Sequence, residues 1–134
     1  MTRLLLLDTS VLLVAAERGQ LQLESLLATV SERLVISAIT ASELLLGVLL
    51  RPSGLARVRS ERDVATMLSV LPVIPVDLEV ARVHAALRAE LGGRGQMLGA
   101  HDMLIAATAL AHDYELATRD RSFDRVPGLV VHHW

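Results

Sequence analysis

The chain has 134 residues, no cysteine and a formal net charge of −2 with histidine neutral, and it carries thirteen arginines and no lysine. The length predicts one domain over residues 1–134, and the lack of cysteine excludes a disulfide framework and Cys-ligated zinc. The lack of lysine excludes a lysine-based phosphate loop or Schiff base, and the negative charge and scarce aromatic residues disfavour a general nucleic-acid binder.

The first half of the chain predicts two short buried strands, each followed by helix. The first strand covers 3–7, and its apolar run is too short for a signal peptide or a membrane span, so we expect a cytoplasmic protein. A first helix is predicted to follow this strand and to end at about residue 18, and a second runs from Leu21 to Val30. The next strand is predicted at 34–36. Thr40 stands three residues before Glu43, a capping-box spacing that predicts the start of an apolar helix.

The second half continues the alternation of helices and strands. A helix over 57–71 has Val58 and Val64 on its predicted buried side. The remaining predicted elements are an extended segment at 71–76, a helix from Asp77 to about Leu91, a glycine-rich mobile loop at 92–99, a helix over 101–112, a strand at 115–118, a turn at 119–124 and a strand at 129–131. This order is typical of a layered α/β domain with a mostly parallel sheet.

Four acids fall near the carboxyl ends of these strands, where α/β proteins bind ligands. Asp8 follows the first strand, Glu43 lies in the helix after the second, Asp120 follows the strand at 115–118, and Asp102 opens the helix leading into that strand. Each acid has a structural explanation by itself. Asp8 could be a helix cap, Glu43 a member of a capping box and Asp120 a turn former. Asp102 could be a first-turn acid favoured by the helix dipole.

Taken together, the acids predict a metal site. Carboxylates crowded at one end of a sheet repel one another and need a cation to stay ionised. Ligands that are all oxygen select Mg²⁺ or Mn²⁺ over zinc, and pairs of such ions activate water against phosphodiesters. The spacing therefore favours metal-dependent phosphodiester chemistry.

Five segments resemble the PIN domain, and more narrowly the VapC-type toxins of bacterial toxin–antitoxin pairs. They are LLDTSVL at 6–12, SAITASEL at 37–44, DMLIAATA at 102–109, LATRD at 116–120 and FDRVPGL at 123–129. The likeness runs from residue 3 to the C-terminus in the expected order and spacing.

This resemblance implies a three-layer α/β/α sandwich and a Mg²⁺- or Mn²⁺-dependent endoribonuclease that acts on RNA. It also implies a homodimer and a cognate antitoxin. By this resemblance, the acidic cluster of the family corresponds to four residues of this chain. Asp8 and Asp102 are expected to be metal ligands, and Glu43 and Asp120 to complete the metal's coordination shell and position water. The side chains expected to orient carboxylates or water are the hydroxyls of Thr9, Ser10 and Thr118.

One departure from the family pattern leaves the fourth acid open. Ser122 stands where relatives often have an acid, so either Asp120 or Asp124 faces the metal. Around them, Arg119 and Arg121 are predicted to hold RNA phosphates. With four acids assigned to metal, eleven acids remain against thirteen arginines, so the negative total does not forbid an RNA substrate.

The sequence also suggests partner surfaces and leaves other function classes to weigh. Core packing is the default explanation for the leucine-rich helices of the first half, and their surplus also fits the implied homodimer and an antitoxin groove that reaches toward the acids. A non-catalytic PIN-like scaffold that binds a partner protein is the alternative. A histidine zinc site is disfavoured by the absence of an HExxH spacing, and an aspartyl phosphatase by the absence of lysine and of an acid two residues after Asp8.

Overall fold

The computed structural model describes residues 3–29 and 33–134 of the chain. A parallel five-stranded sheet lies at its centre, with the strand order β3-β2-β1-β4-β5. The strands are β1 (Leu5–Leu7), β2 (Leu34–Ser37), β3 (Val73–Ile74), β4 (Glu115–Thr118) and β5 (Val131–His133). Because all of them run in the same direction, their carboxyl ends lie at the same end of the sheet.

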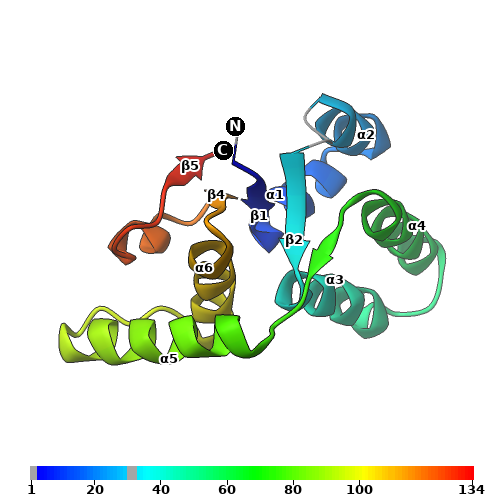
Figure 1. The fold of residues 1–134 in the computed structure, drawn as a ribbon. Coiled ribbons are helices and arrows are strands. Elements are labelled where there is room, and N and C mark those ends of the chain that lie inside the picture. Colours follow the sequence, from blue (N-terminus) through cyan, green and yellow to red (C-terminus); the bar gives the residue numbers. More distant parts are fainter. Residues whose placement is uncertain (1–2, 30–32) are drawn as a thin grey trace.

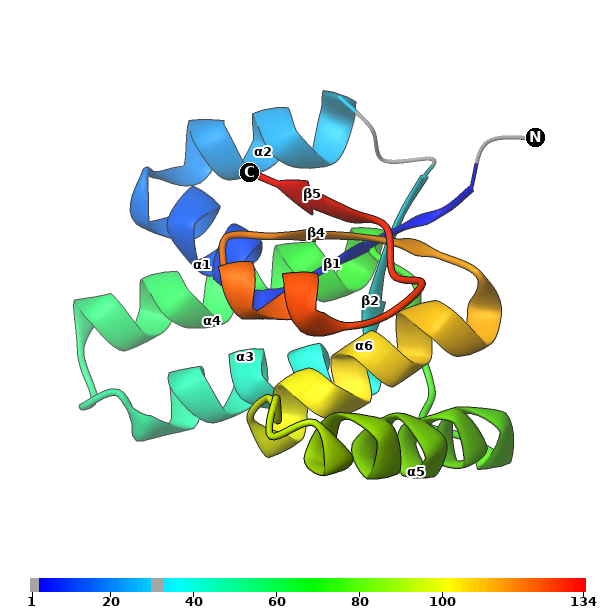
Figure 2. The ribbon, with the colours of Figure 1, turned by 90° about the vertical axis from the view of Figure 1, so that its left-hand side faces the viewer.

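Helices cover both faces of this sheet, so the predicted three-layer α/β/α sandwich is confirmed. Figure 1 shows α2 and α4 on one side of the strands and α5 and α6 on the other, and Figure 2 shows the same arrangement after a quarter turn. The helices are α1 (Thr9–Glu17), α2 (Gln20–Thr29), α3 (Ala38–Leu50), α4 (Leu55–Val70), α5 (Leu78–Gly93), α6 (Ala100–His112) and the short 3-10 helix η2 (Arg121–Arg125).

The leucines of β1 show why the sheet is buried on both faces. Leu5 and Leu7 pack with α1 to α4, whereas Leu6 points to the opposite face and packs with α5 and α6. All three are buried, because side chains alternate along a strand and both faces of a parallel sheet are covered by helices. The apolar residues of β1 thus belong to two core clusters, one on each face of the sheet.

Helix α3 begins earlier than predicted, because Ser37 and not Thr40 is its cap. The Ser37 hydroxyl accepts a hydrogen bond from the Thr40 main-chain N–H at 3.1 Å, and the helix starts at Ala38. The predicted capping box is therefore wrong, and Thr40 lies fully buried inside the helix. The two hydroxyl residues stand three positions apart, and the one at the end of β2 takes the cap. Glu43 is consequently not held at the helix terminus.

Helix α5 extends two residues into the predicted glycine-rich loop. Its end is closed by hydrogen bonds from Gln96 N–H to the Leu91 carbonyl and from Gly95 N–H to the Gly92 carbonyl. This is a Schellman motif, and Gly95 supplies the left-handed conformation that it requires, with a φ of 67°. The predicted end of the second helix at Val30 lies outside the described residues.

The last strand lies two residues beyond its predicted position at 129–131. Gly128 adopts a φ of 79°, and Leu129 N–H still bonds to the Val126 carbonyl, so the turn after η2 continues to this point. Strand pairing begins only at Val131, which lies opposite Leu116 of β4. The exposed histidines that follow carry no apolar pattern, and for this reason the sequence did not place them in a strand.

Several large apolar side chains on α3 and α4 are exposed. Val58 was predicted to be buried but is 59% exposed, which corrects the orientation of the first turns of α4. On α3, Leu49 and Leu50 are 65% and 74% exposed. Among the described residues, no helix combines the length and apolarity needed to cross a membrane.

Candidate active site at the carboxyl end of the sheet

Asp8 is a buried carboxylate at the junction of β1 and α1. It caps α1, and Oδ1 accepts a hydrogen bond from Thr9 N–H at 2.9 Å. Oδ2 accepts two hydroxyl hydrogen bonds, from Ser10 at 2.8 Å and from Thr118 at 2.7 Å. These donors offset the cost of burying a carboxylate that is only 5% exposed. The predicted capping role of Asp8 is therefore real and is compatible with a second role in chemistry.

Glu43 reaches the same end of the sheet from the second turn of α3. The Thr9 hydroxyl donates to its Oε1 at 2.9 Å and lies 3.2 Å from the hydroxyl of Thr40. On the other side, Nδ1 of His101 lies 3.7 Å from Oε2 of Glu43. Because α3 starts at Ala38, the carboxylate faces α1 and α6 instead of its own helix terminus.

The pKa of Asp102 is shifted by its burial and by the charges of the other three acids. Its pKa is raised from the ordinary value of 3.8 to about 6, first by burial and then by the negative charges of Asp8, Asp120 and Glu43. A positive charge on His101 works in the opposite direction. Electrostatic repulsion of this kind requires proximity, so the four acids predicted from strand ends lie around one region.

The segment after β4 is tied to Asp8 through two hydroxyl groups. Thr118 donates to Asp8 and accepts from Asp120 N–H at 3.0 Å, while Ser10 donates to Asp8 and accepts from Arg119 N–H at 3.2 Å. Asp120 also caps η2, with Oδ1 accepting from Ser122 N–H at 2.9 Å. The three hydroxyl residues expected beside the acids thus all contact one of them. Figure 2 shows β1 and β4 leading to α1 and η2 at this end of the sheet.

The remaining predicted residues lie nearby but are engaged differently. Asp124, in η2, lies 2.8 Å from Nε2 of His133, and it is not among the charges that raise the pKa of Asp102. Arg119 donates to the main-chain oxygen of Trp134 at 2.9 Å. Arg121 is exposed at the start of η2.

Two neighbours of the acids were not in the predicted set. Thr40 was interpreted as a helix cap, and His101, at the start of the predicted helix over 101–112, was not assigned to the site. The structure places Thr40 beside Thr9 and His101 beside Glu43. For Thr40 the available signal was the alternative cap at Ser37. His101 could have been found from its position one residue before Asp102.

The donors at this end of the sheet are oxygens, which suit Mg²⁺ or Mn²⁺. Within residues 3–29 and 33–134, no three acidic or histidine side chains already stand together in a metal-binding arrangement. Binding an ion would therefore require side-chain rotation, which is open to the partly exposed Glu43 and Asp102 and to the exposed Asp120. The oxygen donor set fits the ion, and Asp8 is the member whose orientation is already held.

A parallel α/β/α sandwich with acids converging at the strand ends defines the class, and comparison with known proteins agrees. The family model of the PIN domain matches residues 5–129. The "VapC ribonuclease Y4jK" of Sinorhizobium fredii is 37% identical over 138 residues, which cover 98% of each chain. The chain belongs to the VapC family of PIN-domain ribonuclease toxins.

Solved structures show the same fold in toxin–antitoxin assemblies. A chain of DNA-bound VapBC from Salmonella typhimurium superposes with a TM-score of 0.87 at 28% identity, over 99% of both chains. A chain of a toxin–antitoxin complex from Klebsiella pneumoniae superposes with a TM-score of 0.68 at 27% identity, over 96% of this chain and 98% of that one. Relatives of this protein are thus known in complex with antitoxins.

Proposed function

We propose that this chain acts in the cytoplasm, as one domain, as a Mg²⁺- or Mn²⁺-dependent endoribonuclease that hydrolyses RNA phosphodiester bonds. The observation that carries the proposal is the gathering of four carboxylates from separate elements at the strand ends, where hydroxyl groups link Asp8, Glu43 and the segment of Asp120. The pKa of Asp102 agrees with it, since it is raised first by burial and then by the charges of the other three acids. A protein that only binds a partner has no need to tolerate such repulsion. In a ribonuclease, the same negative charges that repel one another would attract a cation bound among the four carboxylates.

In this proposal, Asp8 and Asp102 hold the metal, and Glu43 and Asp120 complete the shell and position water. When bound, the ion supplies Lewis-acid stabilisation of charge on the phosphate and lowers the pKa of water. The chain's own contribution is orientation. Ser10 and Thr118 fix the carboxylate of Asp8, and Thr9 donates one hydrogen bond to that of Glu43.

Asp120 is favoured over Asp124 as the fourth acid. Its charge acts on Asp102, whereas the carboxylate of Asp124 is paired with His133. We assign Asp124 a supporting role, in which it ties η2 to β5. This arrangement holds the turn that carries Asp120, Arg119 and Arg121.

Arg119 and Arg121 are proposed to hold RNA phosphates beside the acids. Both are exposed and flank Asp120, so their positive charge lies where a substrate backbone would pass. Arginine pairs with phosphate through its planar set of N–H donors, which holds the chain without stacking bases. The scissile bond can thus be positioned by arginines on either side of an acid.

The toxin is also proposed to form a homodimer and to bind a cognate antitoxin. A hollow of about 430 Å³ on α3 and β3 is lined almost wholly by apolar residues, including Leu45, Leu46 and Leu49, and suits a second copy of the chain. A hollow of about 270 Å³ between α1, α3 and α4 carries both acids and arginines and suits an antitoxin segment. Covering exposed leucines is the physical reason for the first contact, and the second would cover the exposed Leu13.

Ribonuclease activity is tested with purified protein and single-stranded RNA. We expect cleavage with Mg²⁺ or Mn²⁺, none with EDTA, and a loss of at least about a hundred-fold with Asp8→Asn or Asp102→Asn. Glu79→Gln, an exposed acid in the first turn of α5, is the matched control and should cleave like wild type. Equal cleavage by all variants would mean a contaminating nuclease and would refute the assignment.

Metal binding separates the enzyme from the scaffold alternative. Calorimetric titration with Mn²⁺ should show saturable binding to wild type and to Glu79→Gln, and little to Asp102→Asn. A wild-type protein that binds no Mn²⁺ and cuts no RNA would favour a scaffold whose role is to bind a partner protein.

A further inference from the structure

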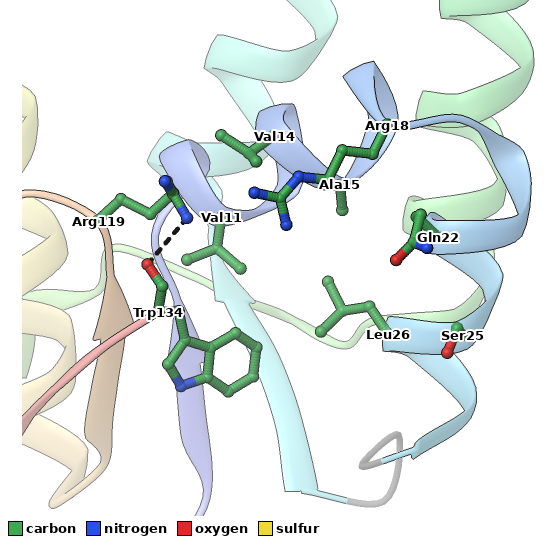
Figure 3. A pocket seen from close by; sticks show the side chains of 9 residues that line it. All are labelled: Val11, Val14, Ala15, Arg18, Gln22, Ser25, Leu26, Arg119 and Trp134. Atoms are coloured by element: carbon green, nitrogen blue, oxygen red, sulfur yellow. Dashed lines mark hydrogen bonds between the residues drawn. The ribbon is translucent and has the colours of Figure 1, made fainter.

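A hollow of about 410 Å³ lies beside the proposed active site, between α1, α2 and the end of β5. Figure 3 shows its lining, with the apolar side chains of Val11, Val14 and Leu26 on the walls and the indole of Trp134 at one side. Arg18 and Arg119 both line it, and Figure 3 shows their guanidinium groups turned toward each other. No acid lines it. The hollow therefore combines apolar walls, an aromatic ring and positive charge.

The hollow is connected to the acids through one serine. Arg119, which lines the hollow, donates its main-chain N–H to Ser10 at 3.2 Å, and Ser10 in turn donates to Asp8 at 2.8 Å. Val11, on the wall, directly follows Ser10 in α1. A polymer with one phosphodiester at the acids would thus pass Arg119 on its way to the hollow.

The two arginines are available to an anion. In the described part of the chain, the guanidinium of Arg18 has no hydrogen-bond or ion-pair partner, and that of Arg119 makes one hydrogen bond, to the main-chain oxygen of Trp134. A guanidinium carries five N–H donors, so most of this capacity is unused. The same bond ties Arg119 to Trp134, a residue that is 40% exposed.

From this arrangement we infer a nucleotide subsite, in which the hollow takes a base flanking the scissile phosphate. The base lies against the indole of Trp134 and the apolar wall, and Arg18 and Arg119 bind the adjoining phosphate. One ring does not make a multi-base stacking surface, but a single base has a flat apolar face of the right kind for it. The other two hollows suit this ligand less, because one contains Glu17 and Asp63 and the other has no charged residue.

The subsite rests on the proposed ribonuclease function but can be tested without cleavage. Trp134 is the only tryptophan, so its fluorescence reports on the hollow directly. With EDTA present, a ten-nucleotide single-stranded RNA should quench this fluorescence in a saturable manner. A ribose-phosphate chain of the same length without bases should bind roughly ten-fold more weakly. Equal binding of the two chains, or no quenching by RNA, would overturn the inference.

The charge contribution is tested with labelled RNA and fluorescence anisotropy. Arg18→Gln should weaken binding roughly five-fold and reduce the slope of log Kd against log salt by about 0.7, the value for one phosphate contact on a single strand. Arg82→Gln, an exposed arginine on α5, loses the same charge elsewhere and should change neither quantity. An equal effect of the two variants would indicate general electrostatic attraction and would overturn the assignment of Arg18.

Kinetics distinguish a failed subsite from a failed ribonuclease. Trp134→Ala should raise KM for RNA roughly ten-fold with kcat little changed, and Trp134→Phe should restore most of the affinity. A wild-type enzyme that cleaves RNA while both variants keep its KM would refute the subsite alone. Quenching by RNA without any cleavage would refute the ribonuclease assignment and leave the hollow as an RNA-binding site with no scissile phosphate beside it.

Discussion

The hydroxyl of Thr118 donates a hydrogen bond of 2.7 Å to Oδ2 of Asp8, although 110 positions separate the two residues in the chain. The contact follows from strand register. Leu7 and Ala117 are partners in the pairing of β1 with β4, so the next residues along both strands leave the sheet side by side. This pair of strand ends fixes the one acid of the site that is fully buried.

Removal of this hydroxyl is expected to cost stability. Thr118→Val keeps the side-chain shape but takes a donor from the buried Asp8 and an acceptor from Asp120 N–H, so urea unfolding should show a loss of about 1–3 kcal/mol. Thr108→Val is the matched control, because that buried threonine only bonds to the Leu104 carbonyl of its own helix. Its free energy of unfolding should change by less than about 0.5 kcal/mol. Similar losses in both variants would contradict the assigned role of Thr118.

The raised pKa of Asp102 predicts how stability depends on pH without metal. The folded pKa of about 6 lies above the ordinary 3.8, so this contribution to stability is fully present below pH 3.8 and is lost as pH rises through about 6. In EDTA at pH 7.5, Asp102→Asn should therefore be more stable than wild type, by about 1 kcal/mol because partial exposure screens the repulsion. Thermal unfolding at several pH values measures this.

Addition of Mn²⁺ should reverse the order of the two proteins. A cation neutralises the repulsion in wild type and raises its melting temperature, whereas Asp102→Asn lacks a ligand and should gain little. A variant that is less stable than wild type in EDTA at pH 7.5, and equally so at pH 4, would show that Asp102 is held by favourable contacts instead.

Mn²⁺ binding and RNA cleavage by variants distinguish Asp120 from Asp124 as the fourth acid. Asp120→Asn should weaken Mn²⁺ binding and RNA cleavage by at least about ten-fold, because it removes a carboxylate whose charge reaches Asp102. Asp124→Asn should keep most of the Mn²⁺ affinity, since that carboxylate is paired with His133. Calorimetry and initial cleavage rates give both quantities. The opposite ranking would make Asp124 the fourth acid.

The exposed leucines of α3 predict the oligomeric state. Leu49→Glu places a charge in the apolar hollow on α3 and β3 and should weaken a homodimer by about 2 kcal/mol, visible as a monomer by light scattering coupled to gel filtration. Val130→Glu alters an exposed apolar residue near the opposite edge of the sheet and should leave the dimer intact. A wild-type monomer at all concentrations would remove the basis for this interface.

The sequence located the four acids through strand ends, and it could do so because short apolar runs bounded by polar residues are readable without tertiary information. It misplaced the cap of α3, since Ser37 and Thr40 are equally good capping residues and only the end of β2 selects between them. It also missed the true span of β5, whose histidines are assigned to a strand only by pairing with β4.

The sequence by itself determined the chemistry of this protein: oxygen donors in place of sulfur, arginine in place of lysine, and leucine runs that must be buried in a parallel sheet. These properties belong to residue types and their local periodicity. Tertiary structure decided to which acid each hydroxyl donates a hydrogen bond and which acids repel Asp102. It also decided that Trp134 lines the same hollow as Arg18 and Arg119. Such relationships depend on strand register and helix packing between distant segments, which no local pattern encodes.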